Sequence, residues 1–137
     1  MKIVLLALDA QRATGSISKL AGVLGADQPF QALTTAAVDV PGHVLSPAPK
    51  PYSPDESLAV VDRLRRTAAI ALANRRNYTA LRSDPLALEF LADADLVIVG
   101  DDVSVRAGRD VAHRLGRQVW GRISTAPYAI GMVTREA

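Results

Sequence analysis

The sequence predicts an α/β fold, a Rossmann-like three-layer sandwich with a parallel sheet of four or five strands. Residues 3–8 and 96–99 are short apolar runs without polar alternation, which is typical of strands buried on both faces of a parallel sheet. Helical periodicities lie between the strand-like segments, and this alternation favours right-handed crossovers with helices on both faces. Because 137 residues are about one domain in length, we expect a single domain over 1–137.

The first half of the chain predicts a strand over 3–8, at the centre of the sheet, followed by a helix from about 16 to 24. Gly25 is a plausible stop for that helix. A weaker strand is expected over 36–40. Residues 41–54 contain five prolines, so we expect an extended proline-rich loop there, without sheet or helix.

In the second half, Ser53, Pro54 and Glu56 form a capping-box pattern that predicts a helix to about residue 74. We expect its buried stripe to contain Leu58, Val61, Leu64, Ala68 and Leu72. Asp84 and Pro85 predict a short capped helix that ends near Asp93. Beyond it we expect a strand over 96–99, a helix over 104–115, a strand over 118–123 and a last short strand within 128–133.

The composition excludes several classes of protein. Sixteen basic and fourteen acidic residues leave a net charge of +2, less than a strongly basic nucleic-acid binder carries, so nucleic acid is not an expected partner. The absence of cysteine excludes a disulfide framework and a thiolate nucleophile. The first apolar run is shorter than the apolar region of a signal peptide, and no stretch approaches the ~20 apolar residues of a membrane span. We therefore expect a cytoplasmic protein with no membrane span.

Ligands of open parallel sheets bind beyond the carboxyl ends of the strands. Polar residues follow each predicted strand, so these side chains are expected to share one edge. We predict there a site for a small anionic, nucleotide-like or sugar-nucleotide-like ligand. The candidate residues are Asp9, Gln11, Arg12, Thr14, Gly15, Ser16, His43, Asp101, Asp102 and Ser124.

The turn after the first strand matches neither common phosphate-binding motif. A dinucleotide fingerprint needs three glycines, whereas only Gly15 lies in this turn, and a P-loop pattern is absent. What remains is a helix amino end with hydroxyls at Thr14, Ser16 and Ser18, a generic anion site. The alternative interpretation is that these residues only cap the helix.

The acidic residues allow a third function. Asp9 with Asp101 and Asp102 could hold Mg²⁺ in a small phosphotransfer enzyme, because hard cations prefer carboxylate oxygens. The lysine that receiver domains carry after a late strand is not present, and we prefer Asp102 as a helix cap. The sequence predicts no metal site, identifies no cofactor and does not decide whether the protein is an enzyme.

Histidine and arginine residues suggest further alternatives. His43 could act as a general acid or base, or be a solvent-exposed loop residue, while His113 is expected on a helix surface. The densest basic segment either forms a solvated helix face or attracts anionic partners. The second function class is therefore a non-enzymatic interaction or assembly protein that docks through its helices onto a partner or a second copy. The arginines are Arg63, Arg65, Arg66, Arg75, Arg76 and Arg82.

Two segments resemble the N-terminal Rossmann-like domain of GT-B-type glycosyltransferases. "MKIVLLALDAQRATGSISKLAGVLG" is similar to the first strand, glycine-containing loop and helix of that domain, and "ADADLVIVGDDVSVRAGRDVAHRLGRQVWGRI" to a later strand–helix–strand unit. The resemblance implies a domain that helps to hold an acceptor, with Gly15 facing the cleft and His43 as a conceivable base. Such transferases carry their nucleotide-sugar site on a second domain, so the resemblance implies a stand-alone or fragmentary domain. The alternatives are a degenerate relative and an unrelated small protein.

Overall fold

The computed structural model describes residues 2–46, 49, 60–116, 119–122 and 134–135. Within these residues the strands form one six-stranded sheet in the order β3-β2-β1-β4-β5-β6. Neighbouring strands from β3 to β5 are parallel, and β6 is antiparallel to β5. The α/β prediction with a parallel sheet is therefore confirmed. The elements are β1 Ile3–Ala7, α1 Ala13–Leu24, β2 Gln31–Thr34, β3 Gly42–Val44, α2 Val60–Ser83, α3 Pro85–Ala92, β4 Leu96–Val99, α4 Asp102–Arg114, β5 Val119–Arg122 and β6 Thr134–Arg135.

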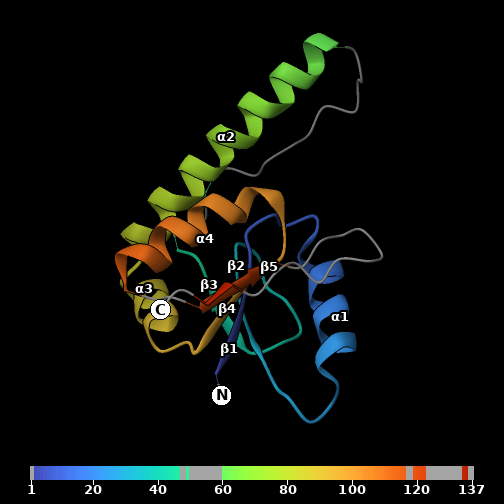
Figure 1. Ribbon diagram of the computed structural model, residues 1–137, viewed down its shortest axis with the longest axis vertical. Coiled ribbons are helices and arrows are strands. Elements are labelled where there is room, and N and C mark those ends of the chain that lie inside the picture. Colours follow the sequence, from blue (N-terminus) through green and yellow to red (C-terminus); the bar gives the residue numbers. More distant parts are fainter. Residues whose placement is uncertain (1, 47–48, 50–59, 117–118, 123–133, 136–137) are drawn as a thin grey trace.

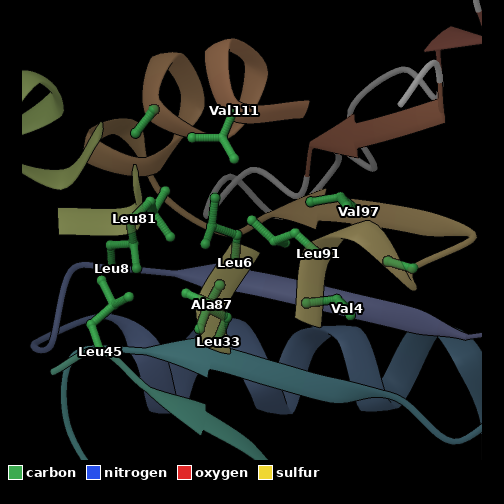
Figure 2. Packing of buried hydrophobic residues seen from close by; sticks show 12 residues of the cluster. Val4, Leu6, Leu8, Leu33, Leu45, Leu81, Ala87, Leu91, Val97 and Val111 are labelled. Carbon is green, nitrogen blue, oxygen red and sulfur yellow. The ribbon is translucent and has the colours of Figure 1, made fainter. Parts of the chain in front are cut away.

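Helices cover both faces of the sheet, which makes the three layers of a Rossmann-like sandwich (Figure 1). Alternate residues of β1 point to opposite faces. Leu5 packs with Leu20 of α1 on one face, whereas Leu6 belongs to the cluster formed with α2, α3 and α4 on the other. Figure 2 shows this second cluster, with Leu81, Leu91 and Val111 directed toward the sheet.

Strand β1 is the centre of the sheet, as predicted. All five of its residues are buried, and it pairs with β2 on one side and β4 on the other. Helix α4 lies close against it: a Cβ atom at Gly108 would lie only 2.6 Å from Leu6 Cδ2. The strand that the sequence predicts most clearly, β1, is therefore the one against which β2, β4 and α4 lie.

The strand predicted over 36–40 is wrong, and so is the absence of sheet from the proline-rich loop. Strands β2 and β3 lie on either side of residues 36–40 instead. These two segments form strands because β2 pairs with β1 and β3 pairs with β2, and not because of their local composition. Gly42 permits the β2–β3 approach, because a Cβ atom there would lie 1.7 Å from the carbonyl oxygen of Ala32.

Helix α2 continues to Ser83, nine residues beyond its predicted end, and buries a different face from the one predicted. Leu64 is 71% exposed, Leu72 is 47% exposed, and Ala68 is also exposed. The amino-terminal half of α2 extends beyond the rest of the described chain (Figure 1), so it has no core to contact there. The predicted start at Ser53, Leu58 and the side chain of Val61 lie outside what the structure describes.

The remaining elements lie near their predicted positions, with two corrections at helix ends. Helix α1 begins at Ala13, and its N-cap residue Arg12 makes no side-chain cap, so capping by Thr14, Ser16 or Ser18 is wrong. Helix α4 begins at Asp102 with Asp101 at the N-cap position, so Asp102 is not the cap. The strand predicted within 128–133 lies outside the described residues. None of the described helices has both the length and the apolar character that a bilayer crossing requires.

Candidate functional site

The carboxyl ends of β1 and β4 meet at the point where the sheet changes its winding direction. From β1 the chain passes through α1 to β2, and from β4 it passes through α4 to β5 on the other side. Because α1 and α4 cover opposite faces, the turns after β1 and β4 border the crevice in which open α/β sheets bind ligands. We call Asp9, Arg12, Gly15 and Asp101 at this point the rim.

Asp9 and Asp101 lie side by side at the rim, although 92 residues separate them in sequence. The backbone N–H of Asp9 donates to Asp101 Oδ2 at 3.1 Å, and Ser104 Oγ donates to Asp101 Oδ1 at 2.7 Å. Ser104 Oγ also accepts from the backbone N–H of Leu8 at 2.9 Å. One network therefore joins the end of β1 to the first turn of α4, and the predicted neighbourhood of the two acids is confirmed.

The two carboxyl groups differ in their environments. Burial raises the pKa of Asp101 to about 6, against the hydrogen bonds from Ser104 and the Asp9 amide, while the nearby Asp9 carboxylate raises it further. Asp9 Oδ1 accepts from the backbone N–H of Gln11 at 3.1 Å, and Arg12 Nε lies 3.8 Å from Asp9 Oδ2. The rim thus combines an acid that titrates near neutrality with a second acid beside a cation.

The amino end of α1 borders the same crevice. Its first-turn N–H groups have no intrahelical acceptor, and no side-chain cap from Arg12 replaces one. Gly15 is exposed, and a Cβ atom there would have no heavy atom within 4 Å. Ser16 instead is buried and donates to the carbonyl oxygen of Gly100 at 3.0 Å, so it fixes α1 against β4.

The other predicted site residues have different surroundings. Gln11 and Thr14 are exposed next to the rim. Asp102 lies in the first turn of α4, and its carbonyl oxygen accepts from Asn74 Nδ2. His43 lies on β3, two strands away from β1, and Ser124 lies outside the described residues.

His43 has a carboxylate partner that its sequence neighbours did not reveal. Its Nε2 lies 2.8 Å from Asp84 Oδ2, and that oxygen also accepts from the backbone N–H of Ser46 at 3.1 Å. Asp84 Oδ1 caps α3 by accepting from Leu86 N and Ala87 N. Burial alone would raise the pKa of Asp84, but the hydrogen bonds from His43, Ser46 and Ala87 together hold it below its usual value. This pair therefore fastens the edge strand to the α2–α3 junction.

We expect Asp84→Ala to lower the free energy of unfolding by about 2 kcal/mol at neutral pH, because a helix cap and a buried charge-assisted bond are lost together. Asp84→Asn retains an oxygen that can cap α3, so it should lower the free energy of unfolding by less. Since the pKa of Asp84 is lowered on folding, its contribution is present above about pH 4 and disappears as the pH falls further. Urea unfolding at several pH values measures this difference. Exposed Asp93, at the other end of α3, provides the control Asp93→Ala, and an equal loss in both variants would contradict the role of Asp84.

Two buried asparagines that the sequence reasoning missed join α2 to α4. Asn74 Nδ2 donates to the carbonyl oxygens of Ile70 and Asp102, both at 3.0 Å, and its Oδ1 accepts from Arg106 N and Ala107 N at 3.2 and 3.4 Å. Asn77 Nδ2 donates to the carbonyl oxygen of Val103 at 2.8 Å. Their spacing of three residues places both on one helix face. Asparagine is a poor helix former, so two asparagines three residues apart were the sequence signal that could have indicated this contact.

The described residues contain no cluster of three or more His, Cys, Asp or Glu side chains that could hold a metal ion. Comparison with known protein families, curated proteins and solved structures found no match. The functional argument therefore depends on the rim and the helices themselves.

Proposed function

We propose that this chain is a Rossmann-like domain that binds a small anionic ligand of the nucleotide or sugar-nucleotide type at the rim. The observation that carries the proposal is the meeting of Asp9 and Asp101, joined by the 3.1 Å bond, beside the uncapped amino end of α1. This combination lies at the switch point of the sheet, where such folds bind ligands.

The chemistry of the rim suits a ligand with both an anionic group and hydroxyl groups. The first-turn amides of α1 and the half-exposed side chain of Arg12 would attract a phosphate. Asp9 and Asp101 would accept hydrogen bonds from sugar hydroxyls, because an ionised carboxylate can accept at both oxygens. Gly15 leaves room above the amides, since no described atom fills the space next to it.

The resemblance to GT-B-type glycosyltransferases concerns the domain that helps to hold an acceptor, so the inclusion of sugar nucleotides depends on the hydrogen-bonding chemistry of the rim. The proposal contains no catalytic step and no metal. A small Mg²⁺-dependent phosphotransfer enzyme, the third expectation from the sequence, lacks a supporting cluster among the described residues.

We expect at least one compound from a panel of nucleoside mono- and diphosphates, sugar nucleotides and inorganic phosphate to raise the melting temperature. A ligand that binds only the folded state stabilises it by mass action. Titration calorimetry should then give roughly tenfold weaker binding for Gly15→Glu, because the new carboxylate would fill the open space and repel an anion. Asp9→Asn should weaken binding of the hydroxyl-bearing ligands more than binding of inorganic phosphate.

Gly22→Glu is the matched control, because Gly22 lies in the same helix two turns further on and also has open space next to it. It introduces the same charge away from the rim and should leave binding unchanged. No shift with any compound, or equal losses in Gly15→Glu and Gly22→Glu, would refute the proposal.

A further inference from the structure

A hollow lies on the opposite face of the sheet from α1, between α2 and α4. It is a groove of about 580 Å³. We call it the α2–α4 groove; its lining includes Leu72, Arg75 and Tyr78 of α2 and Arg106 and Asp110 of α4. None of these residues belongs to the rim, so the groove is a separate feature of the molecule.

One side of the groove continues as an exposed apolar stripe along α2. Leu64, Ala68 and Leu72 follow one another at intervals of four residues, which places them on the same helix face. Leu64 is 71% exposed and Leu72 is 47% exposed. From Leu64 to Leu72 the helix rises about 12 Å, or two turns. A stripe of this length matches the apolar face of a short amphipathic helix.

The charge around the groove is positive. Arg75 and Arg106 line it, and Arg106 is 67% exposed. The only acid in the lining, Asp110, is shared between two arginines, with its oxygens 3.8 Å from the Nε atoms of Arg106 and Arg109. Exposed arginines at 65, 76, 82 and 114 add to this charge on the same two helices.

We infer that the α2–α4 groove binds an acidic amphipathic helix of a partner protein. An apolar stripe between arginines complements leucine-type anchors flanked by Asp or Glu, and opposite charge speeds association and selects the partner. A second copy of the chain would bring like charges together. Single-stranded nucleic acid would need several stacking platforms, whereas Tyr78 is the only aromatic residue of the groove lining, and Arg82 lies over its ring at 5.5 Å from the centroid.

The test is selection of binders from a random library of about 16-residue peptides, long enough for four helical turns. We expect the selected peptides to combine Asp or Glu with apolar residues at helical spacing. In fluorescence anisotropy, the Arg75→Glu/Arg106→Glu variant should bind them at least tenfold more weakly, and about 0.5 M salt should weaken binding to the wild type. Lys2→Glu/Lys19→Glu makes the same change in net charge outside α2 and α4, since Lys2 precedes β1 and Lys19 lies on α1, and it should change affinity less than twofold.

Several results would overturn the inference. Recovery of no peptides, selection of basic or uncharged peptides, or equal losses in both double variants would each do so. A short DNA duplex that binds more tightly than every selected peptide, with the same dependence on Arg75 and Arg106, would identify a nucleic-acid surface instead. Dimerisation in sedimentation experiments that Leu72→Ser abolishes would identify a contact between copies. The rim variant Gly15→Glu should not affect peptide binding, so failure at the rim and failure at the groove are distinguishable.

Discussion

Asn74→Ala should lower the free energy of unfolding by about 3 kcal/mol, because the substitution removes the amide that lies between the backbones of α2 and α4. The side chain is 5% exposed and makes four hydrogen bonds. In an uninterrupted helix Arg106 N and Asp102 O are each other's partners, and the Asn74 amide bonds to both. Its loss leaves buried polar groups to be satisfied by rearrangement of α4. Urea unfolding followed by circular dichroism measures the change.

Asn74→Asp tests the donor half of this contact. The carboxylate is nearly the same size but cannot donate to the carbonyl oxygens of Ile70 and Asp102, and it places a charge in a buried position. Asn74→Asp should therefore lower the free energy of unfolding more than Asn74→Ala does at neutral pH, and its effect should become smaller in acid. Thr79→Ala is the control, because exposed Thr79 bonds only to the carbonyl oxygen of Arg75 in its own helix. If Asn74→Ala cost no more than Thr79→Ala, the amide contact would not stabilise the fold.

Asp101→Asn should raise the free energy of unfolding above pH 6. The effect of the substitution on that free energy should be about 2–3 kcal/mol more favourable there than near pH 4. Burial raises the folded-state pKa of Asp101 to about 6, whereas the unfolded value lies near 4. The folded state therefore binds more protons in this interval, and the contribution of Asp101 to stability is present below about pH 4 and is lost as the pH rises through about 6. Asparagine carries no charge and keeps an oxygen for the Asp9 amide.

The measurement is urea unfolding of both proteins between about pH 4 and pH 8, with Asp27→Asn as the control because Asp27 is exposed. A constant difference between Asp101→Asn and wild type across that range would show that Asp101 does not titrate as described. The same variant separates stability from function. If the rim binds hydroxyl-bearing ligands, Asp101→Asn should bind them less tightly although it is more stable, which is the usual exchange at functional sites.

The sequence predicted the parts of the fold that apolar runs specify. Residues 3–8 and 96–99 are uniformly apolar, which is typical of strands buried on both faces, and β1 and β4 lie there. The switch point followed from them, so the meeting of Asp9 and Asp101 was predictable. The proposed ligand class stays a prediction, because no observation of the described residues tests it.

Features fixed by tertiary contacts were not predictable. The stripe of Leu64, Ala68 and Leu72 follows helical periodicity, but periodicity cannot reveal that this half of α2 extends beyond the rest of the described chain (Figure 1). Residues 36–40 contain two valines, whereas "QALT" contains a single β-branched residue, yet pairing with β1 selects Gln31–Thr34. Asp84 lies 41 residues from His43, so local sequence could not indicate the pair.

The central position of β1 has a consequence for synthesis of the chain. Its β4-facing edge is filled by a segment that emerges from the ribosome much later, as illustrated by the bond from Lys2 N to Asp95, 93 residues away. Until then a wholly apolar strand has one open edge, a template for pairing with other chains. Pairing at this edge of β1 therefore waits until β4 has been synthesised, and chaperones that shield nascent apolar segments would act during this interval.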